Sequence, residues 1–209
     1  MKREEKALSS RRRILAAATA EFGAKSYDSA SLNSICNENE ISKGLIYHYF
    51  GNKDDLYLCC VRDCFEKFTA FLQEEDYDFS DFQRGMNQYM ERRILFFRSF
   101  PSLGRLFFYT VLQPPLHLSE QLRQLRVDFD AQCRNYYKTG LSHLCLREGV
   151  TEETALQYFS MFQEMFNSNF QRNMGENNDL NSLMQEHEAQ LSQLLNLMLY
   201  GIAKENFPL

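Results

Sequence analysis

The sequence has few of the residues that make turns, with only four prolines and nine glycines among 209 residues. Proline and glycine punctuate loops, so their scarcity argues against a chain of many short strands joined by tight turns. Hydrophobic residues make up 44% and charged residues 24% of the chain, as in an ordinary globular protein that is long enough to bury a core. We therefore expect an all-α protein.

The sequence also lacks a long apolar run. No stretch approaches the roughly 18 to 20 uninterrupted apolar residues that a membrane-spanning helix needs. The N-terminal MKREEKALSSRRR is basic, but a short apolar run at 14–18 without a small-residue cleavage site follows it, which is not the pattern of a signal peptide. We expect a soluble protein with no membrane partner.

Signs of catalysis are scarce as well. The sequence contains no phosphate-cradling glycine loop, no HExxH and no GxSxG, and its four histidines lie far apart. We expect neither an enzyme nor a cofactor. A catalytic triad assembled only in three dimensions is the alternative that one sequence leaves open.

The six cysteines lie inside helical patterns, which indicates reduced thiols in a cytoplasm. Cys60 and Cys64 are one helical turn apart and Cys59 is adjacent, so a thiolate metal site or a redox site is an alternative. His143 and Cys145 lie elsewhere, and nothing nearby supplies the second ligand pair that zinc sites show. We favour apolar, packed cysteines and expect no metal.

Charge is unevenly distributed along the chain. The net charge is -5, yet residues 1–53 carry nine Lys or Arg against six Asp or Glu, while the remainder carries fourteen against twenty-two. A small basic head thus precedes an acidic body. This split indicates that the head faces a polyanion and the body does not.

The first helix is predicted to begin at Ser9 or Ser10, either of which can be its N-cap, and to end near Gly23. Residues 11–13, all arginine, would then occupy its first turn, where cations oppose the helix dipole. Phosphate groups could neutralise them there. A solvated charge run is the other interpretation.

Two short helices are predicted next. Asp28, Ser29 or Ser31 can cap the first, which carries Leu32, Ile35 and Cys36 on one face, and Ser42 can cap the second, on which Ile46, Tyr49 and Phe50 face inward. This layout is typical of a helix-turn-helix at about 31–50. We expect a DNA-binding domain at 1–53 and a helical effector-binding and dimerisation domain at 54–209.

Six more helices are predicted in the body, at about 52–75, 81–99, 101–113, 117–147, 152–174 and 180–203, with an acidic break at 74–81 and a possible interruption at Gly140. The last two carry apolar residues at alternating spacings of three and four, which make long packing seams. Such seams form either an internal pair or half of a four-helix interface with a second subunit. For that interface we expect Phe159, Phe166, Phe170, Leu191, Leu195 and Met198.

Residues 10–57, which include ISKGLIYHYFGNKDDLY, resemble the DNA-binding head of TetR-family transcriptional regulators. The resemblance covers about a quarter of the chain, and its most specific part is the aromatic run followed by Lys-Asp-Asp-Leu. It implies a homodimer whose two third helices enter successive major grooves of a near-palindromic operator. It also implies a repressor that an unidentified small-molecule effector releases from double-stranded DNA.

The resemblance further implies which side chains contact DNA. Base edges would be contacted by Ser42, Lys43, Gly44 and Leu45, and phosphates by Tyr47, His48 and Lys53. We also expect Ser31 and Arg11 to bind DNA. The chemistry agrees, because a lysine can donate to guanine, a leucine can contact a thymine methyl and a glycine lets the backbone approach the groove floor.

The sequence departs from the family pattern in the turn between the two short helices. Asn39 and Glu40 stand where the family usually has alanine and glycine. A non-glycine residue in a left-handed turn costs about 1 kcal/mol, unless Asn39 takes that conformation. Ala30 likewise replaces a usual threonine, which leaves Ser29 or Ser31 to supply the hydroxyl.

Aromatic residues gather in the body, and aromatic walls with a few polar anchors are typical of small-molecule pockets. For an effector pocket we expect Phe96, Phe100, Phe107, Phe108, Tyr137 and Phe162. Packed core is the alternative for each of them. Two other functions stay open: a DNA-bound interaction protein whose body docks a protein partner, and an enzyme or metal-binding protein that uses the head differently.

Overall fold

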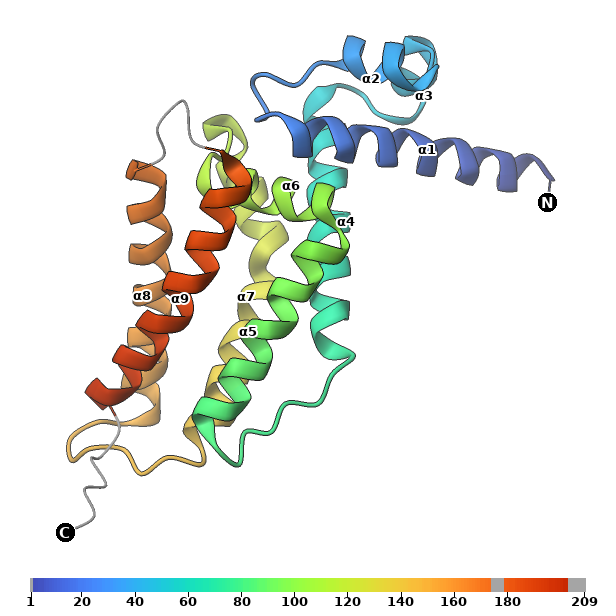
Figure 1. The fold of residues 1–209 in the computed structure, drawn as a ribbon. Helices are drawn as coiled ribbons and strands as arrows, with labels where there is room; N and C mark the ends of the chain where they lie inside the picture. Colours follow the sequence, from blue (N-terminus) through green and yellow to red (C-terminus); the bar gives the residue numbers. More distant parts are fainter. Residues whose placement is uncertain (1, 174–178, 203–209) are drawn as a thin grey trace. The chain divides into compact units, whose positions relative to one another are not determined.

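A computed structural model describes residues 2–173 and 179–202 (Figure 1), and in these ranges the chain forms helices and no strand. The all-α prediction is confirmed. The helices in chain order are α1 (Lys2–Ala24), α2 (Leu32–Asn39), α3 (Lys43–Tyr49), α4 (Lys53–Gln73), α5 (Phe82–Ser99), α6 (Pro101–Leu112), the short 3-10 helix η1 (Leu116–Leu118), α7 (Ser119–Leu141), α8 (Glu152–Asn173) and α9 (Leu180–Ile202).

Most predicted helix boundaries are right to within two residues, and two are wrong. α1 begins at Lys2, so Ser9 and Ser10 lie inside the helix and the arginines at 11–13 are not in its first turn. The upstream residues are mostly good helix formers, which extend the helix past both serines. α7 ends at Leu141, well before 147, directly after Gly140.

The chain forms two compact units. The head unit comprises Met1–Phe68 and Phe97–Arg126, and the body unit comprises Thr69–Phe96 and Val127–Leu209. The first part of α4 therefore belongs to the head unit and its last turn to the body unit. The functional boundary at residue 53 stays a prediction. The start of α4, which follows that boundary, belongs to the head unit and is buried there through Leu56, Tyr57 and Cys60.

In the head unit, α1 packs closely against α6. A Cβ atom on Gly23 would lie only 2.5 Å from the backbone oxygen of Ser102, so this contact requires glycine. Arg105 of α6 donates its Nε–H to the carbonyl of Gly23 at 2.9 Å and thereby satisfies the end of α1. Tyr57 and Thr110 share a buried hydrogen bond of 3.1 Å between α4 and α6.

In the body unit, aromatic rings of α5, α7 and α8 pack against one another. Tyr137 stacks on Phe159 with ring centres 4.1 Å apart, and Phe82 meets Tyr137 edge to face at 5.5 Å. Gly140 lies in the last turn of α7, where a Cβ atom would come within 2.6 Å of the Phe82 ring. A bidentate ion pair between Arg93 of α5 and Glu188 of α9 crosses this core, with both N–O distances at 2.8 Å.

Candidate nucleic-acid interface

Serine side chains cap both short helices of the predicted helix-turn-helix. The Ser31 hydroxyl accepts from the backbone N–H of Ser34 at 3.0 Å and begins α2. The Ser42 hydroxyl accepts from the N–H of Leu45 at 3.2 Å and begins α3. Only residues 40–42 separate α2 from α3, which is the short connection that a helix-turn-helix has.

Glu40 takes the left-handed conformation in the turn, with φ 51° and ψ 41°, and it is the only non-glycine residue with positive φ in the described part of the chain. Asn39 stays helical, and its side chain donates to the carbonyl of Ile35 at 3.1 Å. Arg13 of α1 donates to the carbonyls of Asn39 and Glu40 at 2.5 and 3.3 Å. The turn thus keeps the usual shape without glycine, because Arg13 satisfies the end of α2.

The outer face of α3 is exposed, as predicted. The side chains of Lys43, Tyr47 and His48 are exposed, and half of the Tyr47 surface is accessible. Apart from its own turn of helix, nothing lies within 4 Å of the place where a Gly44 Cβ atom would be, so the fold of the chain itself does not require glycine there. Ser42 is also exposed and Leu45 is half-buried.

The inner face of α3 matches the prediction for Ile46 and Phe50, which are buried. Tyr49 is only half-buried, and its ring lies against His48 with centres 4.9 Å apart. The aromatic run therefore divides between a small core and an outer surface, and Tyr49 lies at the border.

Lys53 begins α4, and Asn52 is the N-cap of this helix. The Asn52 side chain accepts a hydrogen bond from the backbone N–H of Asp55 at 2.8 Å. The Asp55 carboxylate accepts one from the backbone N–H of Gly51 at 3.1 Å. Lys53 is half-buried, and its ammonium group lies 4.3 Å from the centre of the Tyr27 ring. Burial lowers the pKa of Lys53, although the carboxylates of Asp28, Asp54 and Glu21 act against this.

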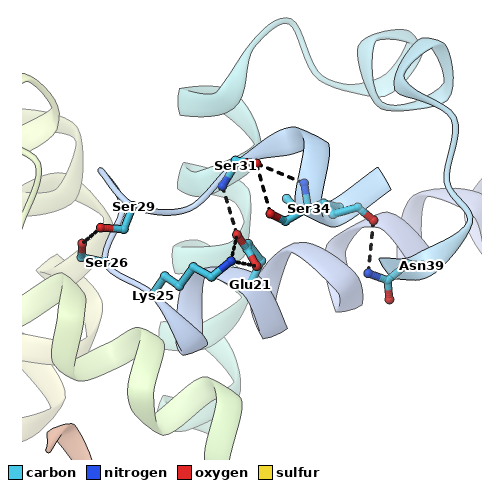
Figure 2. Close-up of polar contacts among 8 residues, drawn as sticks. Glu21, Lys25, Ser26, Ser29, Ser31, Ser34 and Asn39 are labelled. Carbon is cyan, nitrogen blue, oxygen red and sulfur yellow. Dashed lines mark hydrogen bonds and ion pairs between the residues drawn. The ribbon is translucent and has the colours of Figure 1, made fainter. Parts of the chain in front are cut away.

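Ser31 and Arg11, the two remaining predicted DNA-binding residues, are already engaged inside the head unit. The backbone N–H of Ser31 donates to the carboxylate of Glu21 at 3.1 Å, while its hydroxyl caps α2 (Figure 2). The guanidinium of Arg11 lies 5.5 Å from the centre of the Phe50 ring and donates to the Cys59 sulfur at 3.7 Å.

Glu21 was not predicted, although it organises the start of α2. Its side chain is only 6% exposed and pairs with Lys25 at 2.9 Å, one turn further along α1 (Figure 2). The carboxylate thereby holds the loop before α2 on α1. The available signal was a carboxylate within the apolar face of a helix, four residues before a lysine.

The six aromatic residues predicted for an effector pocket are divided between the two units. Five of them pack against other rings, and Phe100 lies against Lys67. In the head unit, Phe107 meets Phe65 and Phe68 at 5.7 and 5.3 Å, and Lys67 lies 3.9 Å from the centre of the Phe100 ring. Phe107 also meets Phe108 at 5.4 Å.

In the body unit, Phe96 meets Phe71 at 5.4 Å, Tyr137 stacks on Phe159, and Phe162 meets Phe166 at 6.0 Å. An open hollow of about 250 Å³ on the body unit is lined by none of the six; its lining residues are Glu75, Asp76, Gln88, Glu91, Arg92 and Leu95.

The residues predicted for the dimer interface are buried within the chain itself, at 3% to 7% exposure: Phe159, Phe166, Phe170, Leu191, Leu195 and Met198. They form the internal seam between α8, α9 and the rest of the body unit. The apolar surface left on α8 is instead a stripe of Tyr158, Met161 and Met165, which are 48%, 60% and 61% exposed. Leu197 of α9 is 66% exposed.

Three of the six cysteines, Cys60, Cys64 and Cys133, are buried, whereas Cys36 and Cys59 are half-buried and Cys145 is exposed. Burial raises the pKa of the Cys60 thiol to about 12 and also raises that of Cys64. The described residues hold no group of three or more His, Cys, Asp or Glu side chains arranged to hold a metal ion. No described helix combines the length and apolar character that crossing a membrane would take.

Comparison with known proteins gives matches to regulators. Residues 14–60 match the family model of bacterial regulatory proteins of the tetR family. The chain is 34% identical over 65 residues to the HTH-type transcriptional regulator HbdR of Aromatoleum sp. (strain CIB), covering 31% of this chain and 28% of HbdR. It is 35% identical over 51 residues to the biofilm operon icaADBC HTH-type negative transcriptional regulator IcaR of Staphylococcus epidermidis, covering 24% and 28%. The chain thus spans less than a third of either relative.

Solved structures resemble the chain over most of its length. A TetR family transcriptional regulator from Chloroflexus aurantiacus J-10-FL is 21% identical, with a TM-score of 0.61 and 94% of each chain covered. The regulator FadR from Bacillus subtilis, solved in complex with stearoyl-CoA, is 16% identical with a TM-score of 0.58, covering 87% of this chain and 97% of FadR. At these identities the likeness concerns the fold alone.

Proposed function

Since residues 14–60 and the fold make this chain a member of the TetR family, we propose that it is a sequence-specific DNA-binding regulator. In this proposal the protein represses transcription, and a small-molecule effector releases it from a near-palindromic operator. One observation carries the proposal. The exposed face of α3 presents Lys43, Gly44, Tyr47 and His48 next to a helix-turn-helix turn of the usual shape. A helix of this kind fits the major groove of B-DNA.

Each exposed side chain of α3 suits a particular partner on DNA. Lys43 can donate to guanine, and the half-buried Leu45 can reach a thymine methyl with its outer edge. Tyr47 and His48 suit phosphate oxygens, as do Lys53 and the backbone N–H groups at the start of α4. We assign Ser31 and Arg11 to supporting the interface, because both already bind elements of the head unit.

We propose that the regulator acts in the cytoplasm as a homodimer that pairs through the exposed stripe of α8 and Leu197. Palindromic sites are read by symmetric dimers, whose recognition helices must lie about 34 to 36 Å apart, one turn of DNA. An effector that binds the wrongly spaced state more tightly must weaken DNA binding, by linkage. The effector site lies in the body in this proposal.

Selection of bound duplexes from random DNA by the purified protein, at two salt concentrations, tests the proposal. The expected result is a near-palindrome whose binding weakens as salt rises. Lys53→Ala and Tyr47→Phe should both weaken binding without changing the selected sequence, because phosphate contacts position the protein and base contacts specify.

Tyr49→Phe is the matched control for Tyr47→Phe, because it removes the same hydroxyl from a half-buried ring of the same helix. It should leave operator affinity unchanged. Binding that depends on salt but shows no sequence preference would contradict the proposal.

A second function is favoured by the packing of the predicted pocket residues. Five of these six rings contact other aromatic rings. The hollow on the body unit is lined by three carboxylates, one amide, Arg92 and Leu95. The body could then dock a protein partner while the head binds DNA, with no small-molecule effector. A screen in which no small molecule changes operator affinity, together with a captured protein partner that does, would establish this alternative.

A further inference from the structure

A chain of three side-chain contacts leads from η1 to Lys53, entirely within the head unit. His117 of η1 places its Nε2 3.3 Å from Oδ2 of Asp54. The other carboxylate oxygen of Asp54 accepts a hydrogen bond from the Tyr27 hydroxyl. The ammonium group of Lys53 in turn lies over the Tyr27 ring, 4.3 Å from the ring centre. A residue far along the chain is thus connected to a proposed phosphate contact.

The protonation states suit these contacts. The hydrogen bond from Tyr27 lowers the pKa of Asp54 most, and the hydrogen bond from His117 and its charge lower it further, so Asp54 is an ionised acceptor. Burial and the Asp54 carboxylate raise the pKa of the Tyr27 hydroxyl, which therefore stays a donor. The contacts are charge-assisted hydrogen bonds, which are stronger than neutral ones.

The Tyr27 ring is a fixed platform. It is 9% exposed, lies 4.9 Å from the Tyr57 ring in an edge-to-face contact and stacks with Phe22 at 6.3 Å. His117 lies on the same ring, with centres 5.5 Å apart. A lysine above an aromatic face is attracted by the ring quadrupole.

A lysine that is already confined loses less conformational freedom when it binds a phosphate. Ordering one long side chain at an interface weakens binding by roughly two- to tenfold. Tyr27, Asp54 and His117 confine Lys53 before DNA arrives, and therefore spare part of this loss.

We propose that His117 is a positioning residue that acts through Asp54 and Tyr27 on Lys53, so that the segment between α6 and α7 sets the affinity for the operator. This inference rests on the proposed function, since it requires Lys53 to contact DNA. It adds a route of regulation: a displacement of η1 reaches a DNA contact without any change in α3.

A double-mutant cycle tests the route, with operator affinity measured by fluorescence anisotropy for the wild type, His117→Ala, Lys53→Ala and the double variant. His117→Ala should weaken operator binding about three- to tenfold. Lys53→Ala should weaken binding and lower the slope of log affinity against log salt by about 0.9, the value for one phosphate. In the double variant, His117→Ala should add nothing to the effect of Lys53→Ala.

Two further variants separate positioning from a structural effect. The amide of His117→Gln can still donate to Asp54, so this variant should bind within about twofold of the wild type. His143→Ala, which removes an exposed histidine of the body unit, should change nothing. His117→Leu fills much of the same space without a donor, so it should weaken binding as His117→Ala does. Wild-type binding by His117→Leu would show that His117 only fills space.

The outcomes distinguish this inference from the function on which it rests. If His117→Ala weakens binding by the same factor with and without Lys53, or not at all, the route is wrong and the regulator proposal stands. If the wild-type protein selects no operator, the proposed function fails and this inference fails with it.

Discussion

Glu40 adopts a left-handed backbone in the turn before α3, where most L-residues are strained. Glu40→Gly should raise the free energy of unfolding by about 0.5 to 1 kcal/mol, because the relief of strain exceeds the extra freedom of glycine in the unfolded chain. Chemical denaturation measures this change. Glu40→Ala retains the Cβ atom, so an equal gain from alanine would show that the carboxylate, and not the backbone, is the cause.

Gly44 lies in open surroundings on α3, so its role can be separated from folding. Gly44→Ala should leave the protein as stable or stabilise it by up to about 1 kcal/mol, since alanine is the better helix former. The same change should weaken operator binding about tenfold, because the methyl group keeps the backbone from the groove floor. Thermal unfolding and operator titration measure the two effects. Unchanged operator affinity would show that position 44 does not approach DNA closely.

Helix α8 has one apolar face inside the chain and a second apolar stripe outside it. Replacing both Met161 and Met165 by glutamate should shift the protein from dimer to monomer, because four charges would face one another across a symmetric interface. Analytical ultracentrifugation measures the shift. Gln171→Glu adds a charge to an exposed position of α8 that is not one turn from Met161 or Met165, and it should leave the dimer intact. A double-glutamate variant that remains dimeric would place the interface elsewhere.

Sequence patterns predicted α2, α3 and α4 well because their caps are local. Ser31, Ser42 and Asn52 each bond a backbone N–H three residues ahead, and such contacts are visible as residue types at fixed spacing. The seams of α8 and α9 were predicted as apolar faces for a similar reason. Periodicity does not say whether a face is covered by the same chain or by a partner, so the choice of Phe159 and its neighbours for the dimer interface could not be made from the pattern.

Contacts between residues far apart in the sequence could not be predicted from sequence patterns either. Arg13 reaches the carbonyls of residues 39 and 40, and Tyr27 reaches Asp54, so both contacts depend on how α1, α2 and α4 fold together. For the three adjacent arginines, the sequence left two interpretations open, phosphate contacts and a solvated charge run. The structure gives Arg11 and Arg13 separate tasks within the head unit.

Across the whole molecule, the most concentrated charge in a core is the pair of Arg93 and Glu188, which are 5% and 3% exposed. Arg93→Met alone or Glu188→Leu alone should lower the free energy of unfolding by about 3 to 5 kcal/mol, because each removes the bidentate partner of a buried charge. The double variant should recover most of the loss, since a packed apolar pair is often as stable. Equal losses in the single and double variants would indicate that the pair itself is a net source of stability.

The same pair gives stability a dependence on pH. Although burial opposes it, the guanidinium of Arg93 lowers the pKa of Glu188 from 4.5 to about 2. A lowered pKa in the folded state stabilises the fold above the unfolded pKa, and this contribution is lost as pH falls from about 4.5 to about 2. The stability advantage of the wild type over Glu188→Gln should therefore shrink across this window in equilibrium unfolding. An advantage that stays constant would show that the Glu188 charge is not the linked group.

The contacts that Arg13 and Glu21 make from α1 have a consequence for protein engineering. They bind the two ends of α2, at Asn39 and Glu40 and at Ser31, so the recognition segment 31–50 is not a self-sufficient module. Transplanting that segment alone into a related regulator would leave behind the groups that close its turn. A graft that carries new operator specificity must include both α1 residues or find their equivalents in the recipient.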